Sequence, residues 1–228
     1  PVPETPSPEP PAPAAAPQLP PEPAAEEPTR VVTLEKTAEP RQPAAAQPEP
    51  KAQPMPEAQT AHSARGVLIS GGDRGIGAAA ARRFYRAGYR VAVLYHSNAE
   101  AAAALEKELP GITAVQCDVA SQASCELAFR AVEQALGHVD VLVSNAGIAQ
   151  QKLFTDITPE EWQRMLAVNL SGAFYLCQLV LPGMIRRKAG RILTVSSMWG
   201  QTGGSCEVHY SAAKAGLIGL TKALAKEE

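Results

Sequence analysis

The sequence lacks several features that would place it in a common functional class. Its formal net charge is only −2 over 228 residues, which gives no reason to expect binding to nucleic acid. No apolar run approaches the roughly 20 residues needed to span a bilayer, and the first residues lack the basic-then-apolar layout of a signal peptide. We therefore expect a cytoplasmic protein that binds neither nucleic acid nor membrane.

Cysteine is scarce as well. The four cysteines are Cys117, Cys125, Cys177 and Cys206, and no two of them have a metal-binding spacing such as C-x-x-C. We therefore expect no metal site. Without an export signal, the cysteines are predicted to be reduced thiols.

Proline is abundant at one end only. Eighteen of the 21 prolines fall within residues 1–56, where the other residues are mostly Ala, Glu and Gln, and the main aliphatic island is Val31, Val32 and Leu34. Such a stretch cannot bury enough apolar surface to offset the entropy lost on ordering. Residues 1–64 are predicted to form a disordered, extended Pro/Ala/Glu-rich arm.

Residues 65–228 are rich in Val, Ile, Leu, Ala and Gly and are long enough for one domain with its own core. Short apolar runs alternate there with stretches of helical spacing. Strands are predicted at 67–70, 90–95, 112–117, 139–144 and 191–196, and helices at 77–87, 99–109, 121–136, 158–188 and 208–226. Because the strands are continuously apolar and are separated by helices, we predict an α/β fold with a doubly wound, Rossmann-like parallel sheet.

A glycine-rich turn follows the first predicted strand, in V-L-I-S-G-G-D-R-G-I-G at residues 67–77. Gly71, Gly75 and Gly77 stand between this strand and the next helix. Glycines there allow a tight bend and let the backbone approach a pyrophosphate, which the N–H groups of the helix N-terminus bind. Alone, this pattern could be an ordinary strand–helix turn; its context favours a site for a pyridine dinucleotide.

Tyr210 and Lys214 stand four residues apart in H-Y-S-A-A-K-A-G, thirteen residues after Ser197. Residues i and i+4 share one face of a helix, so the ammonium group can stabilise the phenolate form of the tyrosine. A ketone that accepts a hydride becomes an alkoxide that needs a proton, and such a phenol can supply it. Tyr-x-x-x-Lys also occurs by chance in many helices, so the pair gains its weight from the preceding glycine turn.

In this order, the motifs resemble the short-chain dehydrogenase/reductase family, whose glycine turn is spaced Thr/Ser-Gly-x-x-x-Gly-Ile-Gly. Ser144-Asn145-Ala146-Gly147 is similar to the family's Asn-Asn-Ala-Gly, with Ser in the first place. The resemblance covers nearly all of residues 66–226, and the most similar subgroup is the 3-oxoacyl-acyl-carrier-protein reductases. It implies that the catalytic residues are Asn169, Ser197, Tyr210 and Lys214. Ser197 would hold the substrate oxygen, and Asn169 would position a water that links Lys214 to solvent.

The glycine turn and the resemblance together imply a cofactor-binding set. It comprises Gly71, Gly72, Asp73, Arg74, Gly75, Ile76, Gly77, His96, Ser97, Asp118, Val119, Asn145, Ala146, Gly147, Tyr210 and Lys214. The second predicted strand ends without the Asp or Glu that would bind the ribose of NAD and repel a 2′-phosphate. That absence, together with Arg74 in the turn, predicts NADP(H) as the cofactor.

The implied function is the NADPH-dependent reduction of a ketone to a secondary alcohol. A 3-oxoacyl thioester on acyl carrier protein is the expected substrate, while sugar, steroid and small-alcohol substrates stay open. A non-catalytic dinucleotide-binding or scaffold module is the second hypothesis. Family members continue beyond the position of Glu228 with a sixth strand, a mobile lid and a seventh strand, so we expect a truncated domain whose sheet is incomplete at its C-terminal edge.

The resemblance also implies a homodimer or homotetramer that pairs through the helices predicted at 158–188 and 208–226. Ala215, Gly216 and Gly219 would permit close approach of a second subunit. The cations Arg186, Arg187, Lys188 and Arg191 suit the end of a helix, and the alternative is docking of an acidic carrier protein. His209 is interpreted as a non-catalytic residue on a different helix face from Tyr210.

Overall fold

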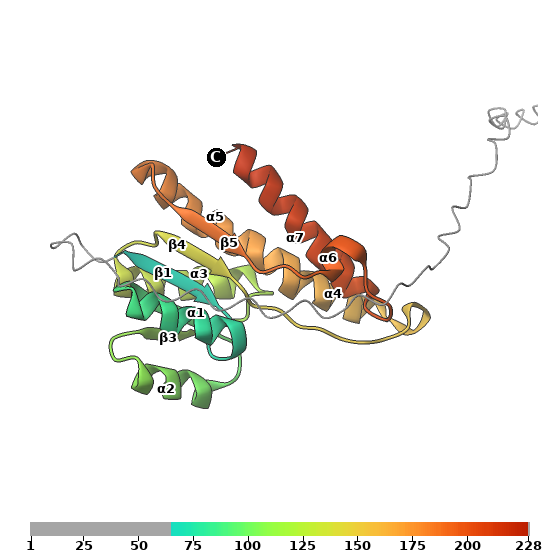
Figure 1. Ribbon diagram of the computed structural model, residues 1–228, viewed down its shortest axis with the longest axis horizontal. Coiled ribbons are helices and arrows are strands. Elements are labelled where there is room, and N and C mark those ends of the chain that lie inside the picture. The colour runs from blue at the N-terminus through green and yellow to red at the C-terminus, as the bar shows by residue number, and fades with distance from the viewer. Residues whose placement is uncertain (1–64, 228) are drawn as a thin grey trace, which may run out of the picture. The chain divides into compact units, whose positions relative to one another are not determined.

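The structure is a computed structural model that describes residues 65–227, so the predicted arm at 1–64 lies outside the described residues. Five strands form one sheet in the order β3-β2-β1-β4-β5, and every neighbouring pair is parallel. The strands are β1 (Gly66–Ser70), β2 (Arg90–Tyr95), β3 (Thr113–Gln116), β4 (Val141–Ser144) and β5 (Arg191–Thr194). The prediction of a doubly wound parallel sheet is confirmed (Figure 1).

Helices follow the strands as predicted, although several predicted strand ends were one or two residues too long. The α-helices are α1 (Gly75–Arg86), α2 (Ala99–Glu108), α3 (Gln122–Leu136), α4 (Pro159–Leu166), α5 (Gly172–Arg187), α6 (Trp199–Thr202) and α7 (Val208–Glu227), and η1 (Phe154–Asp156) is a 3₁₀ turn. Ser121 caps α3, and Thr158 and Glu161 form the capping box of α4. Local side-chain chemistry therefore determines where these two helices begin.

Alternate residues of the central strands serve two cores, one on each face of the sheet. On β1, Val67 and Ile69 pack in the cluster that includes the buried alanines of α1, whereas Leu68 packs in the cluster of α3 and α5. All three side chains are fully buried. Burial on both faces explains why the strand is continuously apolar rather than alternating.

The helical stretch predicted at 158–188 is not one regular helix. Between α4 and α5 the chain forms the π-helical segment η2 (Ala167–Ser171). The continuous stretch Pro159–Arg187 is long and apolar enough to cross a membrane by length and composition alone, and an 18-residue window within it has a mean hydropathy of 1.5. Leu176 and Val180 of this stretch lie in the core of the domain, so packing in the core accounts for the apolar character of the stretch.

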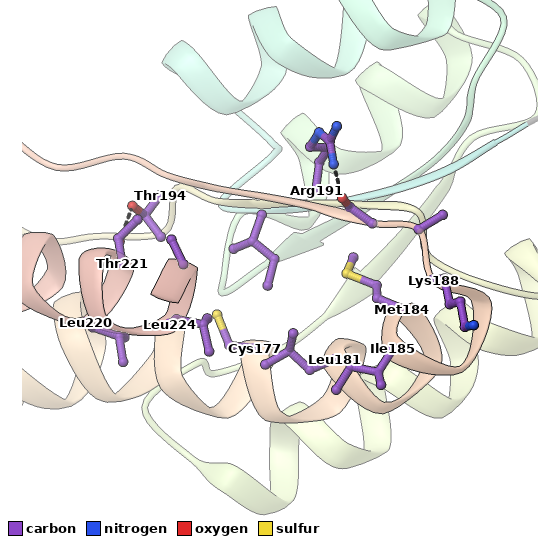
Figure 2. A pocket seen from close by; sticks show the side chains of 14 residues that line it. Cys177, Leu181, Met184, Ile185, Lys188, Arg191, Thr194, Leu220, Thr221 and Leu224 are labelled. Atoms are coloured by element: carbon purple, nitrogen blue, oxygen red, sulfur yellow. Dashed lines mark hydrogen bonds between the residues drawn. The ribbon is translucent and has the colours of Figure 1, made fainter. Parts of the chain in front are cut away.

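Within the described residues, β5 is an edge strand with β4 on one side. An apolar cleft of about 580 Å³ lies beside it, and Figure 2 shows side chains of α5 and α7, among them Leu181 and Leu224, lining this space. On the other face of β5, Leu193 is 48% exposed. None of the residues predicted to bind cofactor or to be catalytic lines this cleft.

Candidate functional site

A second cleft, of about 350 Å³, lies where the carboxyl ends of β1 to β4 meet. In a doubly wound sheet the ligand site lies at this edge, where the strand order reverses direction. Twelve residues of the predicted cofactor set line the cleft: Gly71, Asp73, Arg74, Gly75, Ile76, His96, Ser97, Asp118, Val119, Asn145, Ala146 and Gly147. Gly72 and Gly77 are buried instead, so these two residues contribute through packing.

Either close packing or a positive φ angle disfavours a side chain at each glycine of this turn. A Cβ on Gly77 would overlap the carbonyl oxygen of Gly71, and one on Gly72 would lie 2.6 Å from Cβ of Val93. Gly71 and Gly75 adopt positive φ angles of 61° and 53°, a region that other residues rarely enter. This geometry brings the start of α1 close to the end of β1, and it fits a cradle for a pyrophosphate.

A clasp between β1 and β4 forms the floor of the cradle. The Ser70 hydroxyl accepts hydrogen bonds from the backbone N–H groups of Asn145 and Ala146, each at 3.0 Å, and the Asn145 amide donates to the carbonyls of Ser70 and Gly71 at 3.0 and 2.9 Å. Asn145 belongs to the predicted cofactor set, whereas Ser70 does not. The signal for Ser70 in the sequence is that it is a polar residue at the end of an otherwise apolar buried strand.

Asp118 lies at the adenine end of the predicted cofactor site, and its carboxylate has three neighbours, one of which is His96, whose Nε2 lies 4.0 Å from Oδ2. Its carboxylate accepts from the backbone N–H of Ala120 at 3.0 Å, and Nη1 of Arg164 lies 3.2 Å from Oδ2. Burial acts to raise the pKa of the Asp118 carboxyl, but the Ala120 bond and the Arg164 guanidinium outweigh it and lower this pKa. Arg164 lines the same cleft and was not in the predicted set.

The predicted catalytic pair comes together on α7. Lys214 is only 4% exposed, its Nζ donates to the carbonyl oxygen of Val195 at 2.8 Å, and the same atom lies 5.8 Å from the ring centre of Tyr210. Burial lowers the pKa of the Lys214 ammonium, because the charged form loses solvation. Ser197, just after β5, is half-buried and its Oγ accepts from the N–H of Trp199 at 3.2 Å.

Asn169 lies in the π-helical segment η2, a type of local widening that is frequent at functional sites. Its amide nitrogen donates to the carbonyls of Ile148 and Met165 at 3.0 and 3.1 Å, while its buried Oδ1 has no partner among the described residues. A Cβ on Gly147 would lie 2.6 Å from this Oδ1 and 3.5 Å from Nζ of Lys214. An unsatisfied acceptor and a buried amine therefore face the same small space.

From the sequence, His209 is interpreted as a non-catalytic residue on a different helix face from Tyr210. It is fully buried, and its Nε2 lies 2.9 Å from Oε1 of Gln150 in the loop after β4. For metals, residues 65–227 contain no group of three or more His, Cys, Asp or Glu side chains that could hold an ion. The four cysteines are free.

Comparisons with known proteins agree with this geometry. Residues 65–228 match the short chain dehydrogenase family. The chain is 47% identical over 163 residues to the acetoacetyl-CoA reductase of Rhizobium meliloti, covering 72% of this chain and 67% of that protein. It is 40% identical over 165 residues to the 3-oxoacyl-[acyl-carrier-protein] reductase FabG of Aquifex aeolicus, covering 70% and 66%. It is 37% identical over 163 residues to the reductase MabA of Mycobacterium bovis, covering 72% and 63%.

These relatives are oxidoreductases, and the match extends across the whole described domain. The sequence motifs, the doubly wound sheet and the convergence of Asn169, Tyr210 and Lys214 beside a glycine cradle point the same way. The chain belongs to the short-chain dehydrogenase/reductase family and is similar to its 3-oxoacyl-acyl-carrier-protein reductases.

Proposed function

We propose that this chain is an NADPH-dependent reductase of 3-oxoacyl thioesters. The observation that carries the proposal is the small space shared by Oδ1 of Asn169, Cα of Gly147 and Nζ of Lys214, next to Tyr210 and adjoining the dinucleotide cradle. An orphaned buried acceptor is rare in folded proteins and calls for a partner. A water there would accept from Lys214 and donate to Asn169, which would complete a proton path to the helix that carries Tyr210.

The residues divide the chemistry between them. When bound, the nicotinamide supplies the hydride. The phenol of Tyr210 donates the proton that the developing alkoxide needs, and the nearby Lys214 ammonium stabilises the phenolate that remains. Ser197 would hold the substrate oxygen, since its hydroxyl can donate to that oxygen while Oγ accepts the backbone N–H of Trp199.

NADP(H) is favoured over NAD(H) by the charges at the adenine end of the cleft. Arg74 is exposed and occupies the N-cap position of α1 in an extended backbone conformation. Its side chain makes no capping hydrogen bond, so the guanidinium can reach a phosphate. His96 and Ser97 line the same region, and the end of β2 carries no carboxylate. A 2′-phosphate would therefore meet the Arg74 guanidinium and hydrogen-bond donors, with no carboxylate at the end of β2 to repel it. The Asp118 carboxylate, 4.0 Å from Nε2 of His96, is paired with Arg164.

The substrate class is inferred from the relatives. Relatives that are 37% to 47% identical to the chain are named for acetoacetyl-CoA or for 3-oxoacyl-acyl-carrier-protein. A carrier protein could dock at the cations near the end of α5. Among these, Arg187 has a structural use as well, because its Nη2 donates to the carbonyl of Val139 at 2.6 Å. A cytoplasmic location fits such a carrier-bound substrate.

The purified protein should oxidise NADPH when acetoacetyl-CoA is added, and should do so faster than it oxidises NADH at equal concentration. The physical reason is the missing acid after β2 together with Arg74, which favours the 2′-phosphate. Stopped-flow absorbance under single-turnover conditions measures both rates. If the protein binds the cofactor without turnover, and if the Tyr210→Phe variant behaves in the same way, the result would instead support a non-catalytic dinucleotide-binding module. Preference for NADH would reject the cofactor assignment alone.

The helices α4, α5 and α7 are proposed to pair with a second copy of the chain. On α5 the apolar residues Phe174 and Ile185 are 42% and 51% exposed. On α7, Ala215 is exposed and a Cβ on Gly219 would meet nothing within 4 Å, whereas Gly216 already packs against Leu170 of the same chain. A two-fold pairing would bury these residues.

Light scattering at micromolar concentration should therefore report a dimer or a tetramer. Replacing Gly219 with Arg should shift the mass toward the monomer, because the long charged side chain would block close approach. Replacing the exposed Lys222 of the same helix with Arg is the matched control and should leave the mass unchanged. A clean monomer for the unmodified protein would contradict the proposed pairing.

A further inference from the structure

The first turn of α7 contains a buried histidine that the proposed chemistry does not use. His209 has no exposed surface and directly precedes Tyr210. Its Nε2 lies 2.9 Å from Oε1 of Gln150, which is 59 residues earlier in the chain. Gln150 belongs to the loop after β4, which begins with Asn145 and Gly147 of the cofactor cleft. One hydrogen bond thus joins the catalytic helix to the cofactor-binding loop.

The direction of the hydrogen bond between His209 and Gln150 follows from the second partner of Gln150, which is Glu161. The other end of the Gln150 amide lies 2.8 Å from the Glu161 carboxylate, which also accepts from Nζ of Lys152 at 2.7 Å and from the N–H of Thr158 at 2.9 Å. The Lys152 bond first, then the Thr158 bond, lower the pKa of Glu161 to about 2. An ionised carboxylate can only accept, so Gln150 must present its NH₂ group to Glu161 and its carbonyl oxygen to His209.

A carbonyl oxygen has no proton to give, so His209 must be the donor. Its proton therefore resides on Nε2, and Nδ1 carries a lone pair. Nδ1 is buried and has no hydrogen-bond partner among the described residues, which agrees with an unprotonated nitrogen. A capping carboxylate at the start of α4 in this way determines the tautomer of a histidine at the start of α7.

The loop after β4 is also bonded to the segment that directly precedes α7. The backbone N–H of Lys152 donates to the carbonyl of Cys206 at 2.7 Å, and Cys206 is a non-glycine residue with a positive φ of 60°. The loop carbonyl of Ile148 also accepts from Asn169. The loop is therefore connected to two of the elements that carry catalytic residues.

We propose that His209 is a positioning residue for Tyr210: through the Nε2–H bond to Gln150 it fixes the start of α7 relative to the loop that borders the cofactor cleft. The activity arm of this proposal rests on the proposed reductase function. A buried histidine could instead serve only to fill volume, and the two roles differ in what a substitution must preserve. A positioning role requires a hydrogen-bond donor at the place of Nε2, whereas a volume-filling role requires only a side chain of similar size.

Three substitutions separate the roles. His209→Gln keeps a donor near the place of Nε2, His209→Asn puts its donor near the place of Nδ1, and His209→Leu keeps the volume without a donor. We expect kcat to fall by about 10- to 100-fold in the Leu and Asn variants, the effect expected of a misplacement of about 1 Å at a catalytic group. The KM for NADPH should change much less, and His209→Gln should recover most of kcat.

Gln150→Leu supplies the reciprocal change. Because both side chains serve one bond, the double variant His209→Leu/Gln150→Leu should lose little more kcat than either single variant. Full turnover in His209→Leu, or equal losses in the Gln and Asn variants, would overturn the proposal. If His209→Leu does not fold, the comparison of kcat between His209→Gln and His209→Asn still shows whether a donor is required at the place of Nε2.

A second measurement does not depend on turnover. A long-range ¹H–¹⁵N spectrum of the unmodified protein should show the His209 proton on Nε2, and hydrogen exchange of residues 147–152 should be faster in His209→Asn than in His209→Gln. A proton on Nδ1, or equal exchange in both variants, would refute the link even if the protein proved to be no reductase. If both expected results are found without turnover, the link stands and only the reductase function fails.

Discussion

Replacing Tyr210 with Phe should reduce turnover by about 10²- to 10⁴-fold, the usual contribution of general acid catalysis, and should leave NADPH affinity nearly unchanged. Phenylalanine keeps the ring, which lies 5.8 Å from Nζ of the buried Lys214, and removes only the hydroxyl that supplies the proton. Single-turnover rates with an acetoacetyl thioester measure the first effect. Titration of NADPH fluorescence measures the second.

Tyr85 offers a matched control on the same chain. Its hydroxyl donates to the carbonyl of Pro110 at 3.0 Å, on the α1 side of the sheet. Tyr85→Phe removes an identical group far from the proposed chemistry and should alter turnover little. Loss of less than tenfold in Tyr210→Phe would remove this residue from the role of proton donor, and a similar loss in both variants would point to a general effect on stability.

Replacing Gly77 with Ala should both destabilise the domain and abolish tight dinucleotide binding. The added methyl group would overlap the backbone carbonyl of Gly71 and come within 2.7 Å of the Asn145 amide, and neither group can move without disturbing the clasp between β1 and β4. Overpacking of this kind costs about 1–3 kcal/mol of unfolding free energy. Because α1 must move away from the cradle, NADPH affinity should fall by at least about tenfold, or roughly 1.4 kcal/mol.

A substitution at Gly88, just beyond the other end of α1, separates the loss of stability from the loss of NADPH affinity. It has a positive φ of 79°, and a Cβ there would meet nothing within 4 Å. Gly88→Ala should destabilise the domain by about 1–2 kcal/mol through backbone strain and leave NADPH affinity intact. Urea unfolding and NADPH titration of both variants test the contrast. Equal affinity in Gly77→Ala and the unmodified protein would show that the turn does not contact the cofactor.

Much of the fold could be predicted because its signals are local. Continuous apolar runs such as Val67–Ile69 reflect burial on both sides, and Ser121 and Thr158 cap helices through bonds to residues three positions away. The catalytic pair Tyr210 and Lys214 was recognisable for the same reason, since a spacing of four places both side chains on one helix face. Signals of this kind need no knowledge of the rest of the chain.

The unpredicted parts depend on residues that are distant in sequence. Nothing local in the sequence distinguishes the π-helical segment around Asn169 from a regular helix, because one extra residue in a turn barely alters the apolar period. Ser70 meets Asn145 across 75 positions, and Gln150 meets His209 across 59. Only the strand order of the sheet brings such pairs together, so these contacts follow from the tertiary structure.

The central place of β1 in the sheet also constrains the path by which the chain folds. β1 is bonded on one side by β2 and on the other by β4, and the pairing of Val67 with Val141 spans most of the first half of the domain. Contacts of such long sequence separation repay the entropy of closing the intervening loop only once they are made, and they slow folding. During synthesis, the first strand must wait for the fourth, so the nucleotide cradle cannot exist on a nascent chain until the Asn145 loop has emerged from the ribosome.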